Sequence, residues 1–379
     1  MKFHLLFGKA AQSVLTVGLA MVLAACASGP DKPKPTELGP NANLLGVRQV
    51  WATKMGGTDF PLNIRVVDQT VFLASADGSV LALNSATGVQ LWRADVGAKV
   101  AAGVGSDGQY VALVTRANEL LVLEAGRELW RQKLSAQVFT SPLVAGRRVF
   151  VLGADRAVSA YDAASGRKIW MQQRPGEPLV LQQAGVLLPV GDTLVVGLAG
   201  RLAGLQPGNG SVRWEVPIAS PRGTNDVERL VDLVAHASRV GDSVCVRAFQ
   251  ASVGCVNVAR GNLTWTKPAV GAVGLSGDDR LLFGTEADGK VLAWSRTSGE
   301  RAWVSERLKY RGLSAPLALG RSIVIGDESG LLHFLSREDG SALTRVTTDG
   351  TAVAVAPVVA GDTLIVATRG GSVMAFRPE

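Results

Sequence analysis

The pattern of hydrophobic and polar positions predicts short β-strands separated by glycine-rich turns. Residues 75–92 show the basic unit. Asp77-Gly78 is a β-hairpin signal, and residues 79–84 alternate in the way that a half-buried strand does. A second turn at Thr87-Gly88 is followed, four residues after the glycine, by Trp92. This stretch therefore predicts the order turn, strand, turn, strand.

The same unit recurs through the chain. The spacing G-x-x-x-W occurs six times, and a seventh copy has threonine in place of tryptophan: Gly88/Trp92, Gly126/Trp130, Gly166/Trp170, Gly210/Trp214, Gly261/Trp265, Gly299/Trp303 and Gly340/Thr344. Successive tryptophans are 38, 40, 44, 51 and 38 residues apart. A four-stranded propeller blade takes about 40–45 residues, and no helix-length amphipathic pattern competes with this interpretation. We interpret the tryptophans as packing between neighbouring blades rather than as a ring that stacks on a cofactor.

The two ends of the chain predict how the ring closes. Residues 370–376 supply an inner hairpin strand with no outer strand after it, whereas residues 49–52 form an outer strand with no hairpin before it. Trp51 precedes Trp92 by 41 residues, which is one repeat. We therefore expect an all-β fold over residues 44–379: an eight-bladed β-propeller of four-stranded antiparallel blades, closed by an N-terminal strand around Trp51.

The N-terminus has the features of an export signal. Residues 1–25 combine Lys2 and Lys9 with an apolar stretch, which is typical of a signal peptide rather than of a membrane span. The stretch ends in Leu-Ala-Ala before Cys26, which resembles the bacterial lipobox, where the cysteine carries lipid. An ordinary signal peptide with an incidental cysteine is the alternative.

Residues 26–43 contain four prolines among polar residues, and we expect the lipidated Cys26 to begin an extended, poorly packed tether here. No aspartate follows Cys26 directly, which resembles the sorting signal for the outer membrane. The sequence thus predicts a domain that faces the periplasm and is attached to the cell outer membrane through a lipid anchor.

Composition and charge add little to the predicted fold and location. The hydrophobic fraction is 47%, which is sufficient for a large core, and the formal net charge is +7. Without Lys2 and Lys9, the predicted mature chain has 37 basic residues against 32 acidic ones, a net charge of +5. This mild excess is compatible with anionic lipid headgroups, and the exported location argues against nucleic acid as a partner.

Two links between repeats are longer than the others and predict an interaction surface. They are residues 172–189 and 217–237, and because they precede consecutive repeats we expect them to lie side by side on one face. Together they form a patch of apolar residues rimmed by charge, made of Leu179, Leu181, Glu228, Arg229 and Asp232. Such a patch favours a protein partner. The alternative is that the leucines are simply core residues of inner strands.

Cys245 and Cys255 flank a hairpin centred near Gln250. An oxidising compartment favours a disulfide, but directly opposed strand residues strain one, so two buried free thiols stay open as the alternative. We interpret neither cysteine as catalytic.

The predicted mature chain has only two histidines, His236 and His333, and no H-E-x-x-H or G-x-S-x-G motif. The sequence therefore predicts no catalytic site, no metal site and no cofactor.

The repeat resembles that of a known family. The pattern D-G-x-[VL]-x-A-[LYF] followed by G-x-x-x-W occurs at residues 77–92, 155–170 (with Arg156 in place of glycine) and 288–303, and is similar to the repeat of the quinoprotein (PQQ) dehydrogenases and their relatives. With a lipobox, a proline-rich tether and eight blades, the chain resembles the BamB family. These are the propeller lipoproteins of the BAM complex, the machinery that assembles β-barrels in the outer membrane.

The resemblance implies a non-enzymatic scaffold. It would dock on the periplasmic POTRA domains of BamA, and through BamA on the other BAM subunits, and would assist the folding and insertion of β-barrel proteins. The alternative is a small PQQ-dependent periplasmic dehydrogenase. That enzyme would need a carboxylate-rich pocket, a Ca²⁺ site and a catalytic acid, and the sequence shows no concentration of such residues.

The resemblance also implies which residues contact the partner. The family has a Leu-x-Leu-Arg link and a D-R-L-x-D-x-D link. Leu179-Val180-Leu181 matches the first, with Gln182 in place of arginine. Residues 228–232 match most of the second, with Val234 in place of the last aspartate. The partner-binding residues implied in this way are Leu179, Leu181, Gln182, Glu228, Arg229 and Asp232, and we expect Asp232 to pair with a basic residue on the partner.

Overall fold

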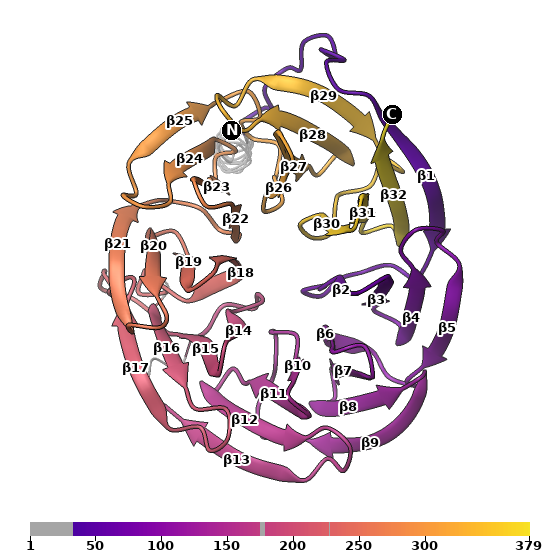
Figure 1. Cartoon of the computed structure of the whole chain (residues 1–379), viewed down its shortest axis with the longest axis vertical. Helices are drawn as coiled ribbons and strands as arrows, with labels where there is room; N and C mark the ends of the chain where they lie inside the picture. The colour runs from indigo at the N-terminus through magenta and orange to yellow at the C-terminus, as the bar shows by residue number, and fades with distance from the viewer. Residues whose placement is uncertain (1–32, 175–178, 227) are drawn as a thin grey trace, which may run out of the picture. The chain divides into compact units, whose positions relative to one another are not determined.

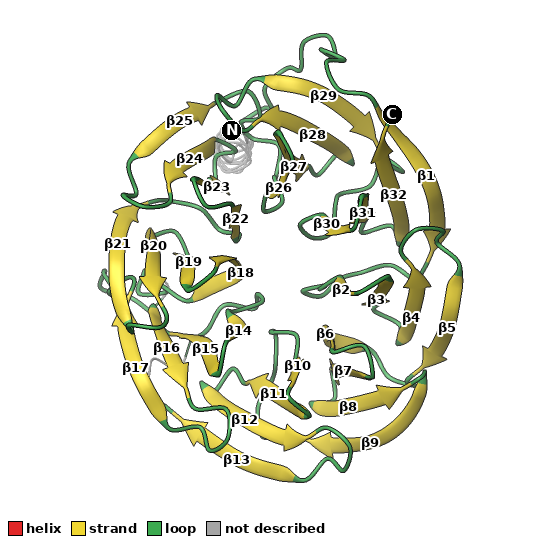
Figure 2. Cartoon of the chain, in the orientation of Figure 1, coloured by secondary structure: helices red, strands yellow, loops and turns green. Residues whose placement is uncertain are grey.

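The computed structural model describes residues 33–174, 179–226 and 228–379. Met1–Pro35 and Thr36–Glu379 form two separate units, and the fold described here is that of the second. It is built from strands in eight four-stranded antiparallel sheets, which stand around a central axis as the blades of a propeller (Figure 1, Figure 2). No helix among the described residues has the length and apolar character needed to cross a membrane. The predicted fold class and blade number are therefore confirmed.

Seven blades follow one another along the chain, and each uses four consecutive strands. The first three blades contain β2 (Arg65–Val67), β3 (Thr70–Ala74), β4 (Ser79–Asn84) and β5 (Gln90–Asp95); β6 (Val100–Ser106), β7 (Tyr110–Thr115), β8 (Glu119–Glu124) and β9 (Arg127–Lys133); and β10 (Leu143–Ala145), β11 (Arg148–Leu152), β12 (Ala157–Asp162) and β13 (Lys168–Gln173). The next two contain β14 (Leu187–Val190), β15 (Thr193–Leu198), β16 (Arg201–Leu205) and β17 (Val212–Pro217); and β18 (Leu233–Val240), β19 (Ser243–Ala248), β20 (Ser252–Asn257) and β21 (Asn262–Pro268). The sixth and seventh contain β22 (Leu275–Gly277), β23 (Leu281–Thr285), β24 (Val291–Ser295) and β25 (Arg301–Ser305); and β26 (Leu317–Leu319), β27 (Ser322–Gly326), β28 (Leu331–Ser336) and β29 (Ala342–Thr347).

The eighth blade closes the ring with strands from both ends of the chain. It contains β30 (Val358–Ala360), β31 (Thr363–Ala367), β32 (Ser372–Pro378) and, outermost, β1 (Val47–Lys54). Figure 1 shows the indigo β1 beside the yellow β32, and the register runs from Val47 opposite Pro378 to Lys54 opposite Ser372. The predicted closure by the strand that contains Trp51 is confirmed. It gives the outer backbone edge of β32 a hydrogen-bonding partner.

The tryptophans of the repeat seal neighbouring blades to one another. Each indole lies against the glycine of the outer turn in the following blade: Trp51 on Gly88, Trp92 on Gly126, Trp130 on Gly166, Trp170 on Gly210, Trp214 on Gly261, Trp265 on Gly299 and Trp303 on Gly340. These glycines have φ between 65° and 79°, and a Cβ atom added there would lie 2.5–3.1 Å from the indole. Glycine is required both for the turn and for the close approach. The packing interpretation of the tryptophans is therefore confirmed.

Thr344 is the exception in the series, and the closure explains it. Thr344 lies in β29 of the seventh blade, and the blade that follows is the one closed by β32 and β1. No turn joins these two strands, since they belong to opposite ends of the chain, and a tryptophan at position 344 would have no turn glycine to cover.

The segment from Thr36 to Leu44 differs from the poorly packed tether that we expected. The Thr36 amide donates to the Lys309 carbonyl at 3.0 Å, and the Leu44 amide donates to the Leu343 carbonyl at 2.8 Å. Between them, the Asn41 side-chain amide donates to the Arg345 carbonyl at 2.9 Å. The segment therefore lies along the seventh blade, because its backbone and side chains find hydrogen-bonding partners there that a proline-rich composition does not reveal.

Candidate protein-docking surface

The two long links converge on one face of the propeller, as the repeat spacing predicted. Gly185 and Val234 form an antiparallel β-bridge, and the Ala235 amide donates to the Ala184 carbonyl at 2.8 Å. The link into the fourth blade is thus hydrogen-bonded to the link into the fifth blade. Residues of both links, among them Leu181 and Asp232, also line one cavity.

The two leucines of the first link differ in exposure. Leu179 is 39% exposed and is one of the large hydrophobic residues that lie open to solvent. Leu181 is half-buried and lines a small cavity that Arg156 and Asp232 also line. The core alternative is therefore wrong for Leu179. Leu181 contacts the core and also lies at the surface.

Asp232 is held within the propeller and does not point freely outward. One carboxylate oxygen pairs with the Arg156 guanidinium at 3.2 Å, and the other accepts the Leu181 amide at 3.0 Å. The Asp232 side chain is only 17% exposed. Both oxygens of Asp232 are thus already engaged within the chain, and its pairing with a basic residue of a partner stays a prediction.

Arg156 is the residue of this surface that sequence reasoning missed. Besides its ion pair with Asp232, it donates from its second terminal nitrogen to the Leu179 carbonyl at 3.2 Å. The available signal was its position, since Arg156 stands where four other repeats have glycine. The sequence gives no direct indication that its side chain reaches both links.

The remaining predicted contact residues form an exposed polar rim. Gln182, Glu228 and Arg229 are all exposed. A hydrogen bond from the Thr224 amide, at 2.9 Å, lowers the pKa of Glu228 and keeps it charged. Val234 is buried, with 2% exposure, so it cannot contact a partner through its side chain. The structure thus leaves Leu179 as the exposed apolar residue of the first link, and these three polar residues as exposed positions on the two links.

A groove of about 610 Å³ lies beside this rim. It runs between the second link and the outer strands of the fifth blade, and its lining includes Glu228, Leu230, Phe249, Leu263 and Lys267. The repeat pattern could not predict it, because the groove results from the path of a link that follows no repeat.

Cys245 and Cys255 form a disulfide across the hairpin of β19 and β20. This decides between the two alternatives left open by the sequence. Both residues are fully buried, and the Arg296 guanidinium donates to the Cys245 sulfur at 3.3 Å. The bond therefore lies in the packing between the fifth and sixth blades, away from any surface where it could act on a substrate.

The two histidines of the described chain lie in separate environments. His236 contacts the Asn63 side chain at 3.2 Å in a cavity of about 220 Å³ along the inner strands, and burial lowers the pKa of His236. His333 is buried and pairs with Asp327 at 2.9 Å. Within the described ranges, no three His, Cys, Asp or Glu residues come close enough together to hold a metal ion.

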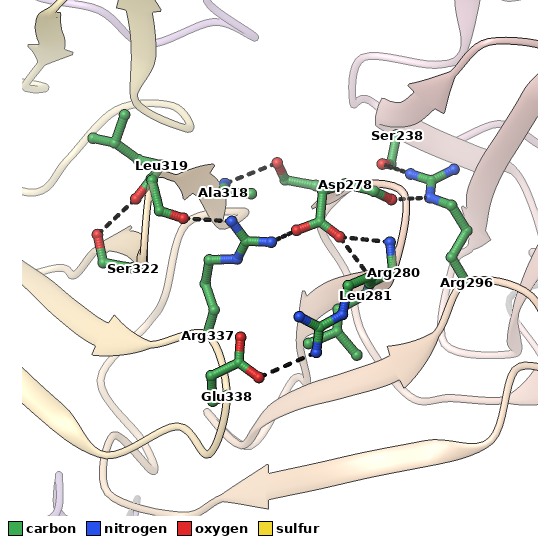
Figure 3. Close-up of polar contacts among 12 residues, drawn as sticks. Ser238, Asp278, Arg280, Leu281, Arg296, Ala318, Leu319, Ser322, Arg337 and Glu338 are labelled. Atoms are coloured by element: carbon green, nitrogen blue, oxygen red, sulfur yellow. Dashed lines mark hydrogen bonds and ion pairs between the residues drawn. The ribbon is translucent and has the colours of Figure 1, made fainter.

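The polar network of Figure 3 joins the fifth, sixth and seventh blades to one another. Asp278 of the sixth blade pairs with Arg337 of the seventh, and Arg280 pairs with Glu338 at 3.2 Å. Arg296 donates to the Asp278 carbonyl and to Ser238 of the fifth blade. These charges are satisfied by neighbouring blades, which is the arrangement of a structural contact rather than of a catalytic centre.

Comparisons with known proteins agree with this fold. The family model described as outer membrane protein assembly factor BamB matches residues 76–305. The outer membrane protein assembly factor BamB of Burkholderia pseudomallei is 35% identical over 374 residues, which cover 97% of this chain and 98% of that protein. The chain therefore belongs to the BamB family. The BamB protein of Bordetella pertussis is 33% identical over 372 residues and covers 96% of both chains.

Solved structures add information on the fold alone. The crystal structure of BamB from Moraxella catarrhalis matches with a TM-score of 0.79 at 22% identity, over 87% of this chain and 99% of that one. A quinohemoprotein alcohol dehydrogenase from Comamonas testosteroni matches with a TM-score of 0.65 at 15% identity, over 89% of this chain and 77% of that one. The BamB family thus shares its propeller with quinoproteins, which accounts for the resemblance of the repeat.

Proposed function

We propose that this BamB-family chain is a non-enzymatic scaffold of the outer-membrane protein assembly machinery. It docks on the periplasmic POTRA domains of BamA, and through BamA on the other BAM subunits, and assists the folding and insertion of β-barrel proteins. The printed names of the relatives favour this function over the PQQ-dependent dehydrogenase. The protein is attached to the outer membrane by lipid on Cys26, which lies outside the described residues, and faces the periplasm.

One observation supports the docking role most strongly. Leu179 is exposed on a link whose backbone is held directly after it, at the Leu179 carbonyl by Arg156 and at the Leu181 amide by Asp232. An exposed leucine on a loop whose backbone is held, on links that also expose Gln182, Glu228 and Arg229, has the composition of an interface anchor with a polar rim. On a mobile loop, binding through the same side chain would also cost the conformational entropy of ordering the loop.

The test is binding of purified protein to the POTRA domains of the cognate BamA. The variant changes Leu179 and Leu181 together to alanine, and a matched control changes Leu91, a 53% exposed leucine on an outer strand of the first blade. Removing an interface anchor typically costs on the order of 2 kcal/mol, or about 30-fold in affinity. We expect the double variant to lose co-purification and the Leu91→Ala control to retain it.

Two results would contradict the proposal. A folded double variant that binds as tightly as the wild type would place the docking site elsewhere on the ring. A double variant that melts well below the Leu91→Ala control would show that both leucines act mainly in the core, and the rim residues would then have to be tested separately.

A further inference from the structure

Arg156 links three segments of the chain that are far apart in sequence. It lies in the hairpin between β11 and β12 of the third blade, and it contacts Leu179 in one link and Asp232 in the other. Asp232 in turn accepts the Leu181 amide. We propose that Arg156 is the positioning residue of the docking surface, through this set of contacts, which we call the Arg156 clasp. The clasp follows from the structure, whereas its effect on a partner rests on the proposed function.

The clasp holds the backbone of the first link between Leu179 and Leu181. The guanidinium binds the Leu179 carbonyl at 3.2 Å, and the Asp232 carboxylate binds the Leu181 amide at 3.0 Å. The Arg156–Asp232 ion pair joins these two hydrogen bonds into one network. The backbone before and after Val180 is therefore held by a donor from one blade and an acceptor from another link.

The environment of the clasp makes these contacts effective. The side chains of Arg156 and Asp232 are 8% and 17% exposed. Water competes weakly for hydrogen bonds at such a site, and bonds that involve charged groups are stronger than neutral ones. The clasp thus differs from the pair of Arg280 and Glu338, where both side chains are about two-thirds exposed, at 66% and 65%.

The backbone conformation of Arg156 points to a role for its side chain. The same hairpin position holds glycine in four other blades, namely Gly78, Gly289, Gly330 and Gly371, all with positive φ. Asn118 occupies it in the second blade with φ of 57°, and Arg156 adopts φ of 63°. This left-handed region suits glycine and tolerates asparagine, but it is unfavourable for arginine. The turn itself therefore does not account for an arginine here, whereas the two contacts of the guanidinium do.

An ordered link also explains how Arg156 would act on binding without touching the partner. Docking on Leu179 requires the link to be fixed, and a link that is already fixed loses less entropy when the partner binds. Asp232 belongs to the same network, so we assign it a positioning role in place of the direct contact that the sequence implied. The exposed residues Leu179 and Gln182 are left to make the contact itself.

The test replaces Arg156 with the residue that the repeat uses at this position. Arg156→Gly relaxes the turn and removes the clasp. Because this leaves the Asp232 carboxylate without its ion pair, a second variant combines Arg156→Gly with Asp232→Asn. The matched control is Asn118→Gly, which makes the same backbone change in the second blade. Each protein is measured by amide hydrogen exchange, by thermal unfolding and by binding to the POTRA domains of BamA.

We expect the Leu181 amide to exchange at least about tenfold faster in both Arg156 variants, with exchange in the core strands unchanged. We also expect affinity for the POTRA domains to fall about tenfold, since the link must then be ordered on binding. The melting temperature of the double variant should stay near that of the wild type. Asn118→Gly should change neither the exchange of Leu181 nor the binding.

Each other outcome overturns a stated part of the proposal. Wild-type exchange at Leu181 in the variants would overturn the clasp, whatever the partner does. Faster exchange throughout the core would show that Arg156 holds the fold rather than the link. Faster exchange of the link alone, with wild-type affinity for the POTRA domains, would overturn the role of Arg156 in docking. A wild-type protein that fails to bind the POTRA domains would overturn the proposed function, and the exchange measurement would still decide on the clasp.

Discussion

The indole of Trp51 lies directly against Gly88, which belongs to the neighbouring blade. A Cβ atom on Gly88 would be 2.6 Å from the ring, and the indole nitrogen donates to the Ser85 carbonyl at 2.9 Å. Trp51 is carried by β1, which is also the outer strand of the eighth blade. One short strand thus completes the last blade and seals it to the first.

Removing this contact should weaken the whole ring. Trp51→Ala should lower the free energy of unfolding by about 3–5 kcal/mol, the usual effect of truncating a large buried aromatic side chain. Gly88→Ala should also destabilise, because the new methyl group would overlap the indole in a turn with φ of 71°. Chemical denaturation measures both effects, and the exposed Leu91→Ala serves as the control. Unfolding of Trp51→Ala at the wild-type denaturant concentration would show that β1 contributes little to closure.

The repeat made the ring predictable from sequence because one local spacing encodes a long-range contact. The glycine of each outer turn and the tryptophan four residues later meet their counterparts in the adjacent blades, so counting Gly88/Trp92 and its copies counts blades. The unpaired strand around Trp51 then specified the closure. Even the exception at Thr344 is consistent with this logic once the last blade is known to lack an outer turn.

The arrangement of the docking surface could not be predicted in the same way. The links were identifiable because they break the period, but the period gives no information on which of their side chains meet. Arg156 and Asp232 are 76 residues apart and belong to different blades, and no spacing rule connects them. The sequence therefore indicated which two links lie side by side, but it gave no sign that an arginine within the chain binds Asp232.

The disulfide should contribute moderately to stability. Its cysteines are 10 residues apart and already paired in the hairpin register, so it closes a short loop. The chain-entropy model then gives an upper value of about 2–3 kcal/mol for its loss. Changing Cys245 and Cys255 together to alanine should lower the free energy of unfolding by up to this amount, with a native far-ultraviolet spectrum. A wild-type protein that shows two free thiols when unfolded without reductant would contradict the disulfide.

Membrane attachment should depend on Cys26. The leader resembles a lipobox ending at this residue, and its thiol is the atom that would carry the lipid. Cys26→Ser should therefore release the protein into the soluble periplasmic fraction, and fractionation after a salt wash measures this. Wild-type protein treated identically controls for loss during washing. Retention of Cys26→Ser in the outer-membrane fraction after the wash would rule out this anchor.

Asp349 makes the closing blade sensitive to acid. Its carboxylate accepts hydrogen bonds from the hydroxyls of Thr351 and Thr368, each at 2.8 Å, and from Ser372 at the start of β32. Lys54, at the end of β1, lies 3.6 Å away. Burial alone would raise the pKa of Asp349, but the hydrogen bonds, that of Ser372 first, outweigh it and hold this pKa well below its ordinary value.

The sign of the pH effect follows from that lowered pKa. A carboxyl whose pKa is lower in the folded than in the unfolded state stabilises the fold at pH values above its unfolded pKa, and the stabilisation is lost as the pH falls through the folded pKa. Asp349→Asn should therefore be less stable than the wild type at pH 7, and the difference should shrink as the pH falls below about 4. Urea unfolding at pH 7, 5 and 3 measures it, with the exposed turn residue Asp68 changed to asparagine as the control. A difference that stays constant over this range would mean that the charge of Asp349 is unimportant and that only the shape of its hydrogen-bonding network stabilises the closing blade.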